Sequence, residues 1–281
     1  MPKIVYLNSR YIEFKNAKVH IEDRGLQFSD SVYEVVPFYK KKLIDFSFHI
    51  KRLKYSLNEL EFKFIVDEKK LKKIFYKIIF LNKINNGLVY LQITRGVQSR
   101  DHSYKNNLKP NIIIYIINKK LNIPNKEFKG KKAITYEDLR WKRRDIKSVS
   151  LLANVLAKKE AVRKKAFEAI LIDRGKITEA TASNVWIVKN NKLITHPSNT
   201  DILKGVTRET LKKIIKINKL NLKEKSFNLK ELYNAEEVFI TSSGNFVTPI
   251  IEIDTKKINK GKIGKISLQL AKLYASLFIH E

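Results

Sequence analysis

The sequence has 281 residues, of which 43% are hydrophobic and 10% aromatic, so it can bury an ordinary core and is not globally disordered. The absence of cysteine excludes disulfides, thiolate zinc sites and cysteine nucleophiles. The formal charge of +29 comes from lysines spread along the whole chain beside many isoleucines and asparagines, which favours compositional bias over a specific nucleic-acid site.

No apolar run approaches the roughly 18 residues that a membrane-spanning helix requires. The first residues, MPKIVYLNSRYIEF, lack the basic, apolar and cleavage regions of a signal peptide. We therefore expect a soluble, cytoplasmic protein without a membrane partner.

The first 118 residues are expected to mix short strands with helices. KIVYLNSRYIEF alternates apolar and polar residues, as a half-buried hairpin does. Helical spacing of apolar residues predicts helices over 49–60 and 71–84. The segments LVYLQITRG and NIIIYIINKK predict two strands around a polar loop, 96–110, which is longer than a hairpin needs. Loops of this length often carry function.

Residues 119–130 contain a proline, a glycine and little periodicity, which is typical of an interdomain connection. We therefore expect an N-terminal α/β domain over 1–118 and a second domain over 131–281. Strands are expected at 133–139, 168–173, 184–188, 193–195, 236–243 and 247–254, and helices at about 150–166, 205–215 and 264–278. This irregular alternation favours an α+β fold over a doubly wound parallel sheet.

Several kinds of chemistry are disfavoured by what the sequence lacks. Its five histidines show no helical i, i+4 pairing, so no metal site is expected. The nucleotide-binding patterns GxGxxG and GxxxxGK[ST] are absent, as is the nucleophile elbow GxSxG. The remaining strong nucleophile is a lysine, which must lose its proton to react.

Lys147 is a candidate for that nucleophile. It follows Arg140, Lys142, Arg143 and Arg144, whose positive field would favour a neutral amine. We expect it at the end of a strand, just before a long amphipathic helix, where sites in α/β proteins often lie. Spacing alone does not separate it from the other lysines.

Lys147 lies in one of four motifs that follow one another along the chain: EDRGLQFSDSVYEVV, RDIKSVSLLANVLAKKEA, ITEATASNVWIV and ILKGVTRETL. Together they resemble the class IV aminotransferases, which are pyridoxal phosphate enzymes of fold type IV, and among these the D-amino-acid aminotransferases. The resemblance covers about residues 4 to 278. It implies an α+β homodimer of two α/β domains per chain, with pyridoxal 5'-phosphate at their interface and 131–281 as the cofactor-binding domain.

The resemblance assigns the reacting groups. Lys147 matches the lysine that forms a Schiff base with the cofactor and then carries the substrate proton. Glu179 matches the carboxylate that keeps the pyridine nitrogen protonated, so that the ring can accept electrons. Val206 and Thr207, at a helix start, match the phosphate-binding backbone. Arg52 and Ser243 match further phosphate ligands.

The resemblance also implies how the substrate is bound. In the D-amino-acid enzymes, an Arg-x-His pair in a loop and a tyrosine hold the substrate carboxylate. The matching residues here are Arg100 and His102 in SRDHS, together with Tyr33. This loop is donated by the other subunit in the family.

Five residues depart from the family pattern, and they put substrate range and rate in doubt more than reaction type. Asp101 between the two loop residues is expected either to neutralise part of the carboxylate trap or to hold Arg100. The other departures are Ser31, Ser150, Ala180 and Thr181.

The sequence therefore predicts transamination between a D-amino acid, such as D-alanine, and a 2-oxo acid such as 2-oxoglutarate. Three alternatives stay open. One is a branched-chain L-amino-acid aminotransferase, although the SRDHS loop argues against it. Another is an aminodeoxychorismate lyase of the same fold. The third is a polyanion-binding protein on a degenerate scaffold, with no bound cofactor.

Overall fold

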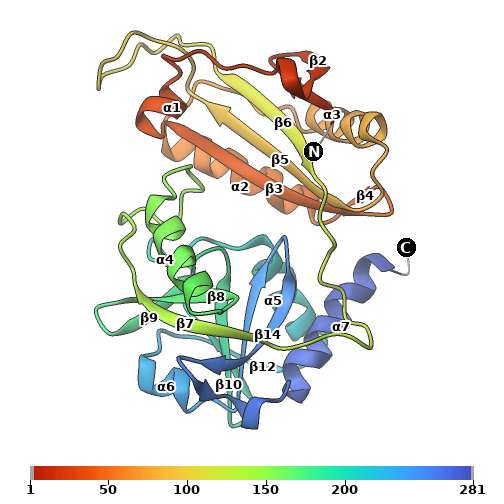
Figure 1. The fold of residues 1–281 in the computed structure, drawn as a ribbon, viewed down its shortest axis with the longest axis vertical. Helices are drawn as coiled ribbons and strands as arrows, with labels where there is room; N and C mark the ends of the chain where they lie inside the picture. Colours follow the sequence, from red (N-terminus) through yellow and green to blue (C-terminus); the bar gives the residue numbers. More distant parts are fainter. Residues whose placement is uncertain (1–2, 280–281) are drawn as a thin grey trace. The chain divides into compact units, whose positions relative to one another are not determined.

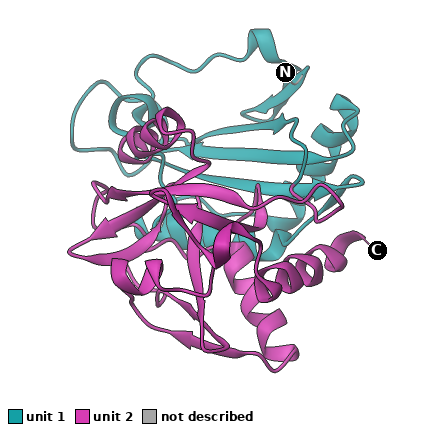
Figure 2. Cartoon of the chain, turned by 60° about the horizontal axis from the view of Figure 1, so that its bottom comes forward, with its two compact units in different colours: residues 1–121, 146–150 teal, residues 122–145, 151–281 magenta. Residues whose placement is uncertain are grey.

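A computed structural model describes residues 3–279 of the chain, which form two compact units (Figures 1 and 2). Unit 1 contains the chain up to Leu121 together with Ile146–Ser150, and unit 2 contains Asn122–Asp145 and the chain from Leu151 onward. Within residues 3–279, no helix combines the length and the apolar character needed to cross a membrane.

Unit 1 is built on an antiparallel sheet of six strands in the order β2-β1-β6-β5-β3-β4. Its strands are β1 (Ile4–Leu7), β2 (Arg10–Glu13), β3 (Ser31–Tyr39), β4 (Lys42–Leu43), β5 (Gly87–Thr94) and β6 (Asn111–Ile117). Its helices are α1 (Arg24–Phe28), α2 (Phe46–Glu59) and α3 (Glu68–Asn82). The predicted hairpin, the two predicted helices and the two strands around the polar loop are confirmed.

The core of unit 1 lies where α2 and α3 pack on the sheet (Figure 1). Buried side chains recur on α3 at Ile74, Ile78 and Phe75, Ile79, the spacing of one helical face. Asp67 begins this helix by accepting a hydrogen bond from the Lys70 N–H (2.9 Å). Local capping and the apolar face therefore both specify the helix.

Unit 2 contains a mixed sheet of nine strands, in the order β12-β11-β10-β13-β14-β7-β8-β9 with β15 paired to β14. Its strands are β7 (Lys131–Glu137), β8 (Glu168–Asp173), β9 (Lys176–Ala180), β10 (Asn184–Lys189), β11 (Lys192–Thr195), β12 (Asn221–Glu224), β13 (Glu237–Ser242), β14 (Phe246–Ile253) and β15 (Lys256–Lys257). Its helices are α4 (Leu152–Arg163), α5 (Val206–Ile217), α6 (Leu229–Tyr233) and α7 (Lys265–Ile279). Parallel and antiparallel pairs occur together, so the predicted α+β class is confirmed.

Two local expectations around α4 are wrong. Lys147 lies outside every helix and strand, because Ile146–Ser150 crosses to unit 1 between β7 and α4. The helix is also not amphipathic in the expected sense, since it buries Ala157 and Ala161 while Leu152 and Val155 are 73% and 58% exposed. The helix thus presents large apolar side chains to solvent in the single chain.

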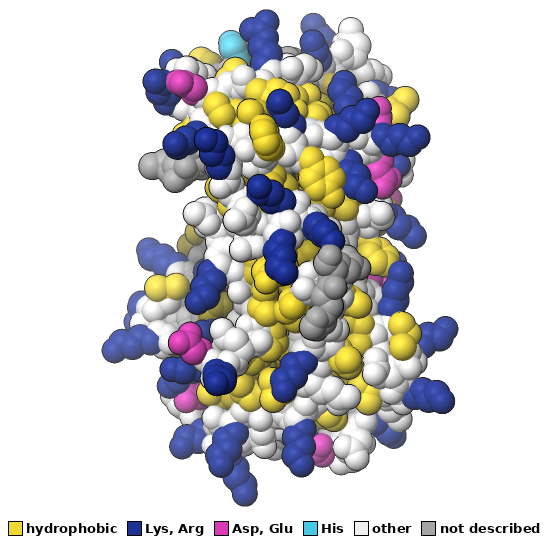
Figure 3. Space-filling model, turned by 90° about the vertical axis from the view of Figure 1, so that its right-hand side faces the viewer, with side chains coloured by type: hydrophobic (Ala, Val, Ile, Leu, Met, Phe, Trp, Pro, Cys, Tyr) yellow, Lys and Arg dark blue, Asp and Glu magenta, His cyan; other side chains and the backbone are white. Residues whose placement is uncertain are grey.

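Figure 3 shows Lys and Arg side chains scattered over the face drawn, with apolar atoms between them. They do not gather into one basic patch on that face. This distribution agrees with the expectation of solvated charges.

Candidate active site

Lys147 is held in unit 1 through its main chain. Its carbonyl accepts a hydrogen bond from the Tyr33 N–H (3.0 Å), and its own N–H donates to Ser56 Oγ (3.1 Å). Two residues later, the Val149 N–H donates to the Ser31 carbonyl (3.1 Å). The segment is therefore attached to β3 and α2, although the sequence gives it no helical or strand periodicity.

The side chain of Lys147 lies beside Tyr33, the tyrosine that the resemblance assigns to substrate binding. Its Nζ is 4.1 Å from the centroid of the Tyr33 ring, and that ring stacks on Tyr90 at 5.8 Å. An amine over an aromatic face is weakly attracted to it. Two predicted site residues are thus brought together.

The expected positive field around Lys147 is not supported. Each arginine of the preceding stretch is paired with a carboxylate inside unit 2: Arg140 with Asp138, Arg143 with Asp145 and Arg144 with Asp173. Most of that charge is compensated at short range, so the charge count of the sequence overstated the field.

Arg52 belongs to a buried cluster in unit 1. Its Nε and Nη2 donate to the two carboxylate oxygens of Glu34, both at 2.8 Å, and His49 Nδ1 lies 2.7 Å from Glu34 Oε2. Burial alone would raise the pKa of Glu34, but the Arg52 guanidinium outweighs it, with help from His49, and lowers the pKa to about 2. The bidentate pair orients Arg52, which would let its outer face meet a phosphate.

The loop residues Arg100 and His102 are exposed, and both contact Phe28 of α1. The Arg100 guanidinium carbon is 4.6 Å from the Phe28 ring centroid, and the His102 ring is 5.5 Å from it. Asp101 forms no ion pair or hydrogen bond with Arg100 among the described residues, so the expectation that it holds Arg100 is wrong. Its carboxylate accepts hydrogen bonds from the N–H and hydroxyl of Ser103, which lower the pKa of Asp101. The acid shapes the turn instead of pairing with Arg100.

Glu179, near the end of β9, is 4% exposed and accepts hydrogen bonds at both oxygens. Oε1 accepts from Arg140 Nη1 and from the Leu203 N–H (3.0 Å), and Oε2 accepts from Asn184 Nδ2 (3.0 Å). Burial raises the pKa of Glu179, and the Arg140 guanidinium opposes that rise. The carboxylate is therefore immobilised, with one donor on Oε2 and two on Oε1.

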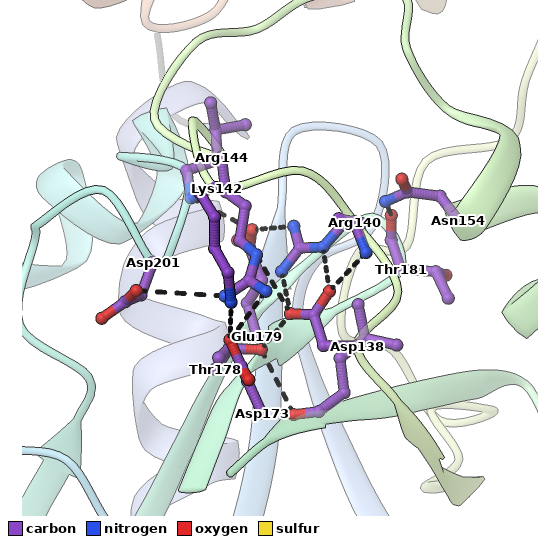
Figure 4. Close-up of polar contacts among 12 residues, drawn as sticks. Asp138, Arg140, Lys142, Arg144, Asn154, Asp173, Thr178, Glu179, Thr181 and Asp201 are labelled. Carbon is purple, nitrogen blue, oxygen red and sulfur yellow. Dashed lines mark hydrogen bonds and ion pairs between the residues drawn. The ribbon is translucent and has the colours of Figure 1, made fainter.

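Arg140 is itself held by a second carboxylate. Its Nε and Nη2 donate to Asp138 at 2.9 and 2.8 Å, and Asp138 also accepts from Thr178 Oγ1 (2.7 Å). Figure 4 shows this network continuing through Arg144 to Asp173, with a hydrogen bond of 2.8 Å. Such a network leaves Arg140 little freedom to rotate away from Glu179.

The start of α5 has the features of an anion site. Its N-cap is Gly205, which provides no side-chain acceptor for the first N–H groups of the helix. Thr207 is 1% exposed, and its Oγ1 has no hydrogen-bond partner among the residues described. A phosphate group would supply acceptors for the Val206 and Thr207 donors, so these residues fit the phosphate of pyridoxal phosphate.

Asn184 connects this helix start to Glu179. Its Nδ2 also donates to the Leu203 carbonyl (2.9 Å). A Cβ on Gly205 would lie 1.9 Å from Asn184 Oδ1, so a glycine is needed there. Carboxylate and helix start are thus positioned by one set of contacts within unit 2.

The remaining predicted positions lie as follows. Ser243 is half-buried in the turn between β13 and β14. The Ser31 hydroxyl donates to the Ile93 carbonyl (3.0 Å), which explains why a serine is accommodated there. Thr181 donates to Glu168, and Ser150 donates its N–H to Ser148 Oγ (3.4 Å).

Sequence reasoning missed the residues that support the site, chiefly Arg140, Asn184, Glu34 and His49. Glu34 had a signal, because a lone acid inside the apolar strand SVYEVVPF must be paired if buried. Asn184 lay in a quoted motif without a role. Among residues 3–279, no three His, Asp or Glu side chains are grouped as metal ligands.

Comparisons with known proteins identify the family of the chain. Residues 31–253 match the family described as Amino-transferase class IV. The D-alanine aminotransferase of Bacillus licheniformis is 42% identical over 94% of this chain and 93% of its own length. That of Listeria monocytogenes is 40% identical over 96% and 94%. The crystal structure of the branched-chain aminotransferase of Escherichia coli shares the fold, with a TM-score of 0.91 at 22% identity over 100% of this chain and 96% of that one. The chain belongs to the class IV aminotransferases.

Proposed function

We propose that this aminotransferase transfers the amino group of a D-amino acid, such as D-alanine, to a 2-oxo acid such as 2-oxoglutarate. The observation that carries the proposal is the exposed Arg100 and His102 pair, whose side chains both pack on Phe28. A guanidinium and an imidazole can bind a carboxylate from one defined side. Nearly full-length similarity to D-alanine aminotransferases supports it.

Pyridoxal 5'-phosphate, when bound, supplies an electron-deficient ring that stabilises the carbanion left when the Cα proton departs. We propose that Lys147 binds it covalently and that Glu179 faces its ring nitrogen. Thr207, Val206, Arg52 and Ser243 would hold the phosphate. The unpartnered Thr207 hydroxyl supports this assignment.

In this proposal, Lys147 Nζ accepts the proton from Cα of the amino donor, and in the reverse half-reaction it donates a proton to Cα of the amino acid formed from the 2-oxo acid. Main-chain hydrogen bonds hold its backbone while the long side chain can swing. Glu179, held by three donors, stays in one orientation and keeps its negative charge toward the ring nitrogen. Tyr33, beside Lys147, would complete the carboxylate-binding set with Arg100 and His102.

We further propose a cytoplasmic homodimer. The large apolar side chains that α4 leaves exposed, at Leu152, Val155, Leu156 and Val162, support association with a second copy. Each chain would then contribute its loop to the site of the other, as the family pattern implies.

Half-reactions test the substrate. Purified holoenzyme is mixed with D- or L-alanine, glutamate or valine, and bleaching of the cofactor band near roughly 410–420 nm is followed. D-Alanine and D-glutamate should react faster than their L-forms. Faster reaction of L-valine would instead indicate a branched-chain enzyme, and pyruvate release from aminodeoxychorismate without an acceptor would indicate a lyase.

A further inference from the structure

The motif EDRG, residues 22–25, which spans the start of α1, holds the loop that carries Arg100 and His102. Arg24 is 3% exposed, and its guanidinium donates to three successive main-chain carbonyls of the loop. The distances are 2.6 Å from Nη1 to the Asp101 carbonyl, 3.2 Å from Nη1 to that of Ser103, and 3.2 Å from Nη2 to that of His102. A buried arginine bound to consecutive carbonyls requires that turn to keep one shape.

Arg24 is itself held in place by Asp30 of the same unit. Its Nε donates to Asp30 Oδ2 (3.0 Å), an oxygen that also accepts from Arg95 Nε (2.7 Å). Its guanidinium lies 4.7 Å from the Phe28 ring centroid and 5.5 Å from that of Tyr104. Phe28 is therefore shared between Arg24, which binds the loop backbone, and the Arg100 and His102 side chains.

Asp23 holds both ends of the loop. Its carboxylate accepts hydrogen bonds from Thr94 Oγ1 (2.8 Å), where β5 ends, and from Asn111 Nδ2 (2.6 Å), where β6 begins. It also accepts from the Gly25 N–H (2.8 Å). A Cβ on Gly25 would lie 2.6 Å from Thr94 Cγ2, so the glycine allows this close approach. Asp23, Arg24 and Gly25 thus act together on one loop.

From these contacts we infer that Arg24 is a positioning residue for substrate binding. It sets the positions of Arg100 and His102 by binding the main-chain carbonyls of Asp101, His102 and Ser103, and it touches neither substrate nor cofactor. This inference rests on the proposed function, in which those two side chains bind the substrate carboxylate. Its structural part, anchoring of the loop, can be tested separately.

The test replaces Arg24 by Met, which keeps an aliphatic chain and removes the donors, and uses the holoenzyme. Trypsin cleavage after Arg100 and Lys105 should accelerate about tenfold, as expected when charged hydrogen bonds to a loop are lost. KM for D-alanine should rise by a similar factor, with kcat and the covalently bound cofactor nearly unchanged. Arg24→Lys, which keeps a charged donor, should show smaller increases in cleavage rate and KM than Arg24→Met. Arg163→Met, which removes an exposed arginine, serves as the control.

Asn111→Ala provides a second variant that leaves Arg24 in place. Releasing one end of the loop should accelerate the same cleavages by about threefold, the effect of one hydrogen bond. Cleavage rates and KM within twofold of the unmodified enzyme in Arg24→Met would overturn the inference. So would faster cleavage along the whole chain with a lower Tm, which would make Arg24 a general stabilising residue.

The positioning role of Arg24 and the carboxylate-binding role of Arg100 can be tested independently. If Arg24→Met accelerates loop cleavage but leaves KM unchanged while Arg100→Met raises it, the positioning role is wrong. If Arg100→Met also leaves KM unchanged, the proposed carboxylate role fails while anchoring stands.

Discussion

The two groups proposed to act on the cofactor, Glu179 and Lys147, are held by the chain in opposite ways. In unit 2, the Glu179 side chain accepts three hydrogen bonds and lies inside a network of paired charges. In unit 1, Lys147 is held by its main chain alone, and its amine contacts the face of Tyr33. A group that stabilises charge gains from a fixed orientation, whereas a group that carries a proton must move. The contrast matches the roles proposed for each.

The largest effect is expected from removing the Lys147 amine, the group that must move. Lys147→Ala should lower the rate of each half-reaction about 10⁴-fold, because proton transfer and covalent attachment are lost together. Stopped-flow absorbance measures it. Lys142→Ala is the matched control, since that lysine is exposed and pairs with Asp173. A Lys147→Ala enzyme with more than a tenth of normal activity would refute the role.

A second test concerns the buried pair in unit 1. The pKa of Glu34 is lowered to about 2 from an ordinary 4.5, so its contribution to the free energy of unfolding is present above pH 4.5 and is lost as the pH falls toward 2. The shift corresponds to about 3 kcal/mol. Urea unfolding between pH 5 and 2.5 should show this loss, and Glu34→Gln should be less stable at pH 5 with a flatter acid dependence. Glu13→Gln, at an exposed ion pair, should keep the normal dependence. Equal acid slopes in Glu34→Gln and the unmodified chain would contradict the assignment.

A third test removes Arg140, the charged partner of the Glu179 carboxylate. Burial already raises the pKa of Glu179, and Arg140→Met would remove the cation that opposes this rise. Glu179 would then need a higher pH to ionise, so the acid limb of the half-reaction rate should move upward. The rate at pH 7 should fall about tenfold to a hundredfold. Arg143→Met, which removes a more exposed arginine paired with Asp145, should leave the profile in place. An unshifted pH profile in Arg140→Met would argue against the claim that Arg140 lowers the pKa of Glu179.

The smallest effect is expected from Thr207→Val, which tests whether the Thr207 hydroxyl serves cofactor binding and not folding. Thr207→Val removes a buried hydroxyl without a partner among the described residues, so the stability of the apoprotein should be unchanged or rise by about 1 kcal/mol. Cofactor affinity should nevertheless fall several-fold. Thr195→Val is the control, because the Thr195 hydroxyl donates to the Val185 carbonyl (2.9 Å) and its loss should destabilise. Thermal unfolding and cofactor titration give both numbers. Destabilisation by Thr207→Val with unchanged affinity would oppose the phosphate assignment.

How far the sequence could predict the site depends on the range of the contacts. Lys147, Glu179 and Thr207 sit in local motifs, so the resemblance could single them out as candidates, although the position of Lys147 in the fold was predicted wrongly. Arg140 meets Glu179 across 39 residues, and Arg24 meets the Asp101 carbonyl across 77. No local pattern encodes such pairings, because the elements between them must first fold.

The same limit applies to the fold. Helices such as α3 follow from apolar spacing and a capping aspartate. The path of Ile146–Ser150 depends on hydrogen bonds to Ser31, Tyr33 and Ser56, which are distant in sequence. Charge counting also failed for Arg140, Arg143 and Arg144, because their carboxylate partners become evident only in three dimensions.

In the proposed function, one lysine of the chain, Lys147, carries the cofactor. Purified protein incubated with pyridoxal phosphate, reduced with borohydride and digested should yield one modified peptide, with the added mass on Lys147. Modification spread over many of the other lysines, or a fully reconstituted protein with Lys147 unmodified, would contradict the account.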